Sequence, residues 1–364
     1  MKEYLSDMPV QTVDRNFHDK HQRVIALWLL VGVLMIIIQV LLGGITRLTG
    51  SGLSMTDWDP IMGIVPPLDH ADWSTAFQRY RETPQFRLVN SSFTLTDFKG
   101  IFFWEWFHRF WARLLGLVFL VPFVFFTVKK WFTRPMVKPM VILFLLGALQ
   151  GLVGWIMVAS GLTGGNTSVD HYKLTIHFIA ALVLLCYTLW FALSLLFAEH
   201  RRTYAPGLRR FALFILIVLG IQLTYGGLMA GLHAALVAPN WPGVNGSFVP
   251  PRLVGDAPWW YELTSSPIAV QCIHRGLAYL LAIFLLMWCW KARRTDRSKP
   301  LFGLAIVPLL LVLLQFVLGV LTVLNSATHI PVVLAVSHQF NGMLLLIALF
   351  ACLFLLRRTA TISP

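Results

Sequence analysis

The chain has 364 residues, of which 57% are hydrophobic and only 12% are charged. Soluble globular domains hold about 25% charged residues, so this composition, with a mean hydropathy of +0.71, excludes an ordinary soluble domain. The net charge of +13 would suggest a nucleic-acid partner in a soluble protein. We expect none here, because the basic residues lie in the connections between long apolar stretches, which places the chain in a lipid bilayer.

Eight stretches are long and apolar enough to cross a membrane, which takes about 20 mostly apolar residues. They cover residues 24–44, 100–128, 139–159, 172–198, 211–231, 267–290, 301–323 and 332–356. The fold class that we predict is therefore an all-α polytopic membrane protein with eight transmembrane helices.

Basic residues sort to one side of this arrangement. Most of the 29 Lys and Arg residues lie in the N-terminal segment, the even-numbered connections and the tail. The positive-inside rule then places these connections and both termini in the cytoplasm. The polar N-terminal segment has no short apolar core followed by a cleavage site, so the first helix is expected to act as the targeting signal, and the cell inner membrane is the expected location.

The first four predicted helices repeat in the last four. A glutamine precedes a glycine by four residues once in each odd-numbered helix. The pairs are Gln39 and Gly43, Gln150 and Gly154, Gln222 and Gly226, and Gln315 and Gly319. Residues four apart share a helix face, where glycine permits close packing and an amide can bond across a bundle. Small-residue packing alone is the competing explanation for the glycines, but it leaves the glutamines unexplained.

This repeat predicts two pseudo-symmetric four-helix bundles. The expected divisions are a cytoplasmic segment 1–23, an N-terminal bundle 24–198 with a long outer loop 45–99, a cytoplasmic linker 199–210, a C-terminal bundle 211–356 and a cytoplasmic tail 357–364. Equivalent positions of the two bundles are then expected to serve equivalent purposes.

One histidine stands in each even-numbered helix: His108, His177, His274 and His338. All four lie about six to nine residues from the outer end, which at 1.5 Å per residue gives a common depth of roughly 9 to 14 Å. Two imidazoles facing each other in each bundle suit a six-coordinate haem, whereas zinc usually takes four ligands around one ion. The glutamines would then serve as bundle-packing or haem-pocket residues. The rival interpretation is a proton relay in a transporter, without iron.

Arginines follow two of these histidines directly. Arg109 and Arg275 are placed to pair with haem propionates near the outer membrane face, and Arg113 lies one turn beyond Arg109. The competing explanation is that the arginines extend toward water or pair with carboxylates.

The two halves differ three residues before the first histidine of each pair, where Glu105 stands opposite Gln271. Glu105 shares a helix face with His108 and is suited to accept and donate protons beside a haem. We therefore predict that the reacting haem lies in the first bundle with Glu105 as the catalytic residue, and that the second haem is a cofactor. A structural ion pair to Arg109 or Arg113 is the alternative role for Glu105.

The outer loop 45–99 is the longest connection in the chain. Trp73, Phe77 and Tyr80 recur at helical spacing within it, which predicts a short amphipathic helix with its aromatic face on the membrane surface. It would act as an interfacial anchor or, alternatively, as a lid over the first haem pocket. The loop around Trp241 and Pro251 would cover the second pocket.

Two stretches of this sequence resemble the signatures of the haem A synthase family. The first is Gly43-Gly-Ile-Thr-Arg-Leu-Thr-Gly-Ser-Gly-Leu-Ser-Met with Trp58 and Pro60, and the second runs from Glu105-Trp-Phe-His-Arg to Gly116. The similarity extends from Gln39 to His338. Many members have a cysteine pair in the first outer loop, and its absence here resembles the mitochondrial and proteobacterial branch.

This resemblance implies the function and the roles of the site residues. It implies that a methyl group of haem O, the substrate, is oxidised to the formyl group of haem A for a terminal oxidase. His108 and His177 would flank haem O, His274 and His338 would ligate haem B iron as cofactor, and Glu105 would be the essential carboxylate. Haem O synthase and cytochrome oxidase assembly proteins are the partners that it implies. The alternatives are a dihaem electron-transfer cytochrome, a proton-coupled transporter and a haem-delivery factor.

Overall fold

The structure is a computed structural model that describes residues 10–56, 62–163, 165–198, 201–248, 250, 255 and 257–357. Long helices dominate it: α1 (Val10–Leu48), α4 (Leu95–Val128), α5 (Arg134–Gly161), α6 (His171–Leu196), α7 (Pro206–Gly231), α9 (Pro267–Ala292), α11 (Val307–Leu324) and α12 (Val332–Leu355). Within the described chain, eight helical spans have the length and apolar composition to cross a membrane. The predicted all-α membrane fold is confirmed.

The seventh span contains a break that the hydropathy pattern does not show. It consists of α10 (Pro300–Leu304) and α11, and Pro308 lies in the first turn of α11. Proline is well placed there because its nitrogen carries no hydrogen to donate within the helix. The apolar run through this region is continuous, so its composition alone predicted one helix.

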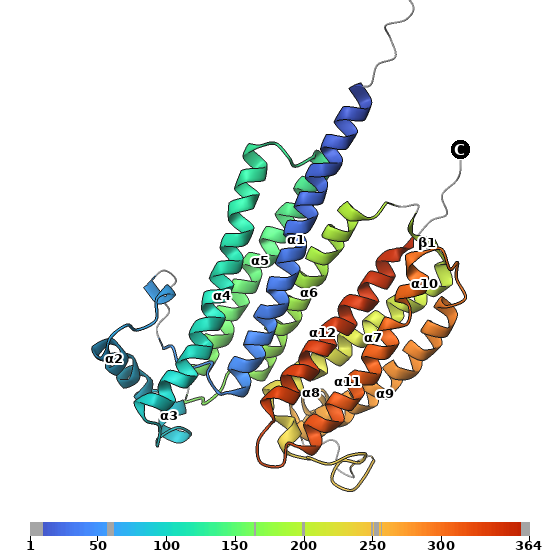
Figure 1. The fold of residues 1–364 in the computed structure, drawn as a ribbon. Helices are drawn as coiled ribbons and strands as arrows, with labels where there is room; N and C mark the ends of the chain where they lie inside the picture. The colour runs from blue at the N-terminus through green and yellow to red at the C-terminus, as the bar shows by residue number, and fades with distance from the viewer. Residues whose placement is uncertain are drawn as a thin grey trace, which may run out of the picture.

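Each half of the chain packs its four spans around a shared interior. In the first half α1 packs on α4 and α6, and α6 packs on α5; in the second half α7 packs on α9 and α12, and α11 packs on both α9 and α12. The halves meet where α6 lies against α7 and α1 lies against α12 (Figure 1). A single apolar core, which includes Leu185, Ile215, Leu285 and Leu349, runs through both halves.

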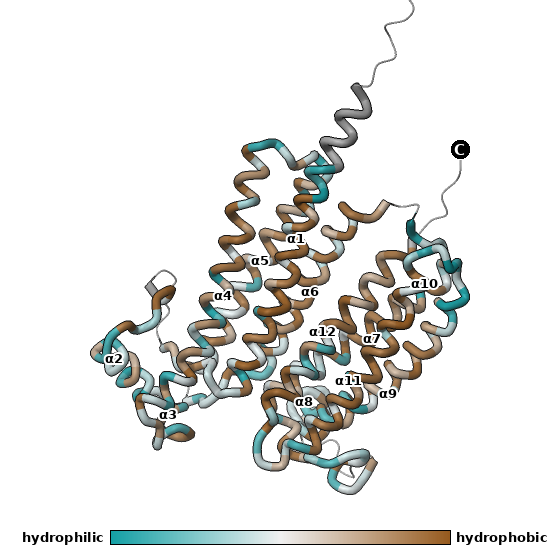
Figure 2. Tube along the Cα trace, in the orientation of Figure 1, coloured by the Kyte–Doolittle hydropathy of each residue, from teal (hydrophilic) through white to brown (hydrophobic). Residues whose placement is uncertain are grey.

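The polar connections gather at the two ends of the helices, while the middle of each helix is hydrophobic (Figure 2). At one end β1 (Thr203–Tyr204), which follows α6, pairs in parallel with β2 (Leu356–Arg357), which follows α12. The start of α1 lies at this end as well (Figure 1). The short elements α2 (His70–Arg81), α3 (Pro84–Leu88) and α8 (Trp259–Ser265) lie toward the opposite end (Figure 1), and η3 (Ala234–Leu236) follows the end of α7 there. The short turn η1 (Met62–Ile64) packs beside α4 at Arg113.

The first outer loop is shorter than predicted, because α1 continues to Leu48 and α4 already begins at Leu95. Thr94 and Asp97 form a capping box that begins α4 ahead of its apolar stretch. The connection therefore covers residues 49–94 instead of 45–99. Trp58 and Pro60 in this loop, and Pro251 in the later one, lie outside the described residues.

The predicted amphipathic helix of this loop exists as α2, but the predicted membrane contact of its aromatic face is wrong. Trp73 packs edge-on against Phe102 with ring centroids 5.1 Å apart, and Phe77 lies 5.3 Å from Phe98. Tyr80 is fully buried. The aromatic face of α2 thus packs on the start of α4, because an apolar helix face is equally satisfied by a neighbouring protein surface.

Candidate functional site

The four predicted histidines lie on four different spans, one each on α4, α6, α9 and α12. The rings of His274 and His338 lie edge-on to one another, with their centroids 6.3 Å apart and their planes inclined by 68°. A ring nitrogen binds a metal at about 2 Å, so two imidazoles on opposite sides of one iron would have centroids about 6 Å apart. The second pair therefore has the separation that a bis-histidine haem requires.

The first pair, His108 and His177, has the same kind of environment. Both side chains are partly buried between helices, and they lie close enough to interact electrostatically. No group of three or more His, Cys, Asp or Glu side chains that would suit a zinc-type site occurs among the residues that the structure describes. Two separate pairs favour two haem-type sites over one cluster.

Every glutamine of the internal repeat contacts the histidine of a neighbouring helix. Gln150 donates to the backbone carbonyl of His177 at 3.1 Å and lies 3.2 Å from its ring nitrogen Nδ1. Gln39 donates to the carbonyl of His108 at 3.2 Å. In the second half Gln222 and Gln315 lie 3.4 and 3.2 Å from Nε2 of His274 and His338, respectively. Each glutamine amide thus holds a histidine from a neighbouring helix, on the side away from the helix that bears the histidine.

The glycine one turn after each glutamine leaves room for the same imidazole. A Cβ atom at Gly154 would lie 2.8 Å from Cε1 of His177, and one at Gly319 would lie 2.9 Å from Cε1 of His338. The corresponding distances are 3.3 Å from Gly43 to His108 and 3.5 Å from Gly226 to His274. The Gln and Gly of each odd-numbered span therefore form a seat for one histidine.

Polar atoms remain without partners inside this seat. Nδ1 of His274 and of His338, and Oε1 of Gln39, Gln150 and Gln222, are buried and accept or donate no hydrogen bond among the described residues. A buried polar group left in this state costs about 1–3 kcal/mol. Such atoms cluster where a polar or metal-bearing ligand would satisfy them, and imidazole nitrogens are the donor atoms that haem iron takes.

Glu105 is almost fully buried, at 2% exposure, and its carboxylate is held by the first outer loop. Oε2 accepts hydrogen bonds from the Ser54 hydroxyl at 2.7 Å and from the backbone N–H of Met55 at 2.8 Å. Oε1 forms an ion pair with Arg109, one turn along α4. The structural ion pair that was one predicted role of Glu105 is therefore present, on a carboxylate next to His108.

The matching turn of the second half also contacts an outer loop, but there the side chains donate to loop carbonyls instead of accepting from loop donors. Gln271 donates to the carbonyl of Ala238 at 3.2 Å, and Arg275 donates to the carbonyls of Ala238 and Gly243 at 3.2 and 2.7 Å. Both halves thus anchor an outer loop through this turn of the helix. Only the first half places a carboxylate there.

The comparisons with known proteins identify the family of the chain. A family model described as cytochrome oxidase assembly protein matches residues 26–350. The chain belongs to this family. It is 40% identical over 340 residues to the heme A synthase of Rhodospirillum centenum, an alignment that covers 93% of this chain and 90% of that protein.

Two further heme A synthases show similar agreement. The protein of Flavobacterium psychrophilum is 39% identical over 90% of this chain and 96% of its own length. The protein of Brucella suis is 39% identical over 90% of both chains. The family membership inferred from the two sequence signatures is confirmed by these relatives.

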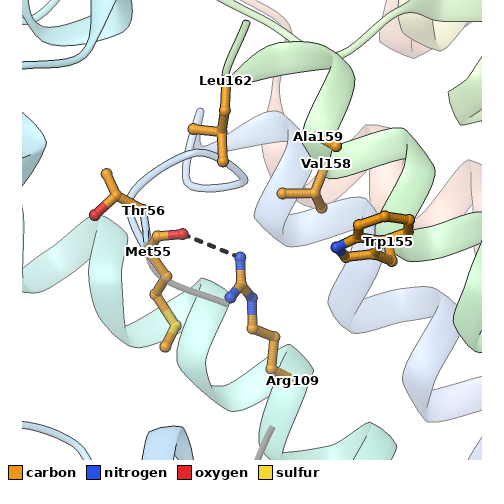
Figure 3. Close-up of a pocket in the computed structure, with 7 residues that line it drawn as sticks. All are labelled: Met55, Thr56, Arg109, Trp155, Val158, Ala159 and Leu162. Atoms are coloured by element: carbon orange, nitrogen blue, oxygen red, sulfur yellow. Dashed lines mark hydrogen bonds between the residues drawn. The ribbon is translucent and has the colours of Figure 1, made fainter. Parts of the chain in front are cut away.

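The arginines of this family member lie against the outer loops. Arg109 also donates to the carbonyl of Met55 at 3.2 Å (Figure 3), and Arg113 donates to the carbonyl of Gly63 at 3.3 Å. Arg109 borders a pocket of about 60 Å³ between the first outer loop and α5. Its other lining residues are Met55, Thr56, Trp155, Val158, Ala159 and Leu162.

Two contributors to the site were missed in the sequence. Ser54 and Met55 hold Glu105 from a distance of about fifty residues along the chain. Both belong to the glycine- and serine-rich stretch after α1, which the sequence marked as a signature without a structural purpose. The sequence held no signal for these two contacts, because the burial of Ser54 is set by the path of the loop and not by its composition.

Proposed function

We infer that this protein is an oxidoreductase that oxidises a methyl group of haem O to the formyl group of haem A. The observation that carries this inference is that a buried carboxylate, Glu105, lies beside one histidine pair, whereas the matching residue beside the other pair is Gln271. The chain is also about 40% identical to heme A synthases over nearly its full length. A cytochrome that only relays electrons has no need of such an asymmetry.

The substrate haem O is assigned to the first half, between His108 and His177, and a haem B cofactor is assigned to the second half, between His274 and His338. The ring separation of 6.3 Å in the second pair and the buried ring nitrogens without partners support the cofactor site. Haem B would supply a one-electron redox centre to the protein. The four glutamines would fix the orientation of the ligand rings, as the groups that hydrogen-bond to metal-binding histidines do at other metal sites.

Glu105 is assigned the handling of protons. Conversion of a methyl to a formyl group is a four-electron oxidation that breaks two C–H bonds of one carbon and adds one oxygen atom. Whichever oxidant supplies that oxygen, protons have to be moved at the reacting carbon. A carboxylate one turn from a ligand histidine is placed to accept them. Ser54, Met55 and Arg109 hold this carboxylate in one orientation.

The remaining assignments concern the ends of the haems and their surroundings. Arg109, Arg113 and Arg275 each donate to a carbonyl of an outer loop and would pair with haem propionates after exchanging that carbonyl for a carboxylate. The haem sites would face the outer side of the cell inner membrane, with both termini in the cytoplasm. Haem O synthase would supply the substrate, and the product would serve cytochrome oxidase assembly.

The test is to extract the haems from cells that make this protein together with a haem O synthase, and to separate them by chromatography. Haem A is expected with the unchanged chain and not with Glu105→Ala, while purified Glu105→Ala protein keeps its haem B. The control is Glu82→Ala, which removes an exposed carboxylate of the outer loop. Haem O persisting in every sample would instead establish a dihaem cytochrome, and a purified protein without haem would leave the transporter.

A further inference from the structure

The two halves differ in how their four spans close around the histidines. In the second half α9 packs against α11, which completes the ring of helices. In the first half α4 packs extensively on only one described span, α1, and α5 packs on α6. The side between α4 and α5 is therefore the part of the first bundle that neighbouring helices do not seal.

Burial along these helices shows the same difference. Only 6% of the apolar window of α4 and 6% of that of α5 are buried, compared with 22% in α9 and 17% in the seventh span. Four small residues face outward along the two helices, and we call their surface the α4–α5 face. They are Ala112 and Gly116 on α4, and Ala148 and Gly151 on α5.

The α4–α5 face leads to the site. Gly151 lies one turn before Trp155, which borders the pocket next to Arg109 (Figure 3), and residues four apart share a helix face. On α4, Gly116 lies seven residues after Arg109, on the same side. A Cβ atom at Gly116 or Gly151 would meet no atom within 4 Å, so this face has space along its length.

We propose that the α4–α5 face is the lateral entrance through which the substrate haem reaches His108 and His177, and the place where its isoprenoid chain lies. This proposal rests on the assignment of haem O to the first half. Haem O carries a long apolar chain on one edge of the porphyrin, and an apolar chain remains in the bilayer rather than crossing a polar outer loop. The closed second half retains its haem, whereas an open first half admits substrate and releases product.

The experiment measures the uptake of haem O by the purified protein in lipid nanodiscs, followed by the absorbance change when the haem binds. Gly151→Trp fills the α4–α5 face with an indole ring, and we expect uptake to slow by about tenfold or more. Gly276→Trp is the control, because Gly276 is also exposed and also has no atom within 4 Å of a Cβ, but lies on α9. Haem B content should stay unchanged in both variants.

The possible outcomes distinguish a failure of the proposed entrance from a failure of the proposed haem O site. Uptake at the unchanged rate in Gly151→Trp would overturn the entrance, while its loss in His108→Ala would still support the substrate site. Uptake that does not depend on His108 would overturn the site itself. Gly116→Trp, on the opposite wall, replaces Gly151→Trp if that variant does not fold. A change in oligomeric mass without a change in uptake would assign the face to a second copy of the chain and overturn the proposal.

Discussion

Ser54 donates a hydrogen bond of 2.7 Å to the carboxylate of Glu105, and each of the two residues is only 2% exposed. A carboxylate offers about four lone-pair positions, and Ser54, Met55 and Arg109 occupy three of them. One position is then left, and under the proposed function it would receive a proton from the substrate. The first outer loop thus holds the Glu105 carboxylate in one orientation.

Replacing Ser54 by alanine tests this positioning. A hydrogen bond to a charged group contributes about 1.5–3 kcal/mol, so Ser54→Ala should lower kcat for haem A formation by roughly tenfold or more, with KM for haem O little changed. Ser51→Ala is the matched control, since Ser51 is a buried serine of the same loop that bonds to Thr49. An equal loss of activity in both variants would mean that the loop fold, and not Glu105, had been disturbed.

Exchanging Glu105 for glutamine separates its charge from its contact with the loop. The amide oxygen of Glu105→Gln can still accept from Ser54 and Met55, so the loop should stay anchored. The amide nitrogen then faces Arg109 in place of Oε1, so the thermal midpoint should fall through the loss of this ion pair, but by less than in Glu105→Ala. Proton transfer by a positioned group contributes about 10²–10⁴-fold to a rate, and haem A formation should fall by that order. Haem extraction and thermal unfolding measure the two effects. Normal haem A formation by this variant would reduce Glu105 to a loop anchor.

The spans and the histidine seats were predictable because their signals are local. Twenty apolar residues in a row indicate a spanning helix whatever it packs against, and a Gln four residues before a Gly defines one helix face. The structure brings each of these Gln and Gly residues to the histidine of the neighbouring helix, as with Gln315, Gly319 and His338. The repeat in the sequence pointed to those positions before any contact was known.

The outer loop was less predictable because its contacts are set by tertiary structure. The pattern of Trp73, Phe77 and Tyr80 is the same for a helix on a membrane and for one on α4, and only the path of the chain decides between them. The bond from Ser54 to Glu105 likewise joins residues whose spacing contains no periodic signal. The difference in closure between α4–α5 and α9–α11 has no counterpart in composition.

Adding a methyl group to the glycine of one seat should affect one haem only. In Gly319→Ala the new Cβ would lie 2.9 Å from the His338 ring, and overpacking of this kind costs about 1–3 kcal/mol. Haem B content should fall while haem O uptake is retained. In Gly154→Ala the new Cβ would lie 2.8 Å from the His177 ring, so haem O uptake should fall while haem B content is retained. Optical spectra and haem extraction from purified protein distinguish the two.

The control for these variants lies within the same helix. Gly151 is one turn before Gly154, but a Cβ there would meet no atom within 4 Å. Gly151→Ala should therefore leave both haems unchanged, because a single methyl group on the α4–α5 face is far smaller than an indole. A loss of haem in Gly151→Ala equal to that in Gly154→Ala would show that helix propensity, and not the seat of His177, explains the effect.

The halves of the molecule are tied together near their outer ends by Arg47. This side chain of α1 donates a hydrogen bond to the carbonyl of Ala230 in the last turn of α7, where the partial negative charge of a helix C-terminus favours a cation. Arg47→Met keeps much of the apolar stem but removes this charge-assisted bond, which contributes about 1.5–3 kcal/mol, while the Ala230 carbonyl still accepts the backbone N–H of His233. The thermal midpoint should fall by several degrees. The control is Arg87→Met, which changes an exposed arginine.

An unchanged midpoint would mean that other contacts hold the halves together. The foremost of these is the bond of 2.8 Å from Gln339 on α12 to the carbonyl of Val40 on α1. Combining Arg47→Met with Gln339→Leu would then give a larger loss than the sum of the two, because each tie would have masked the other.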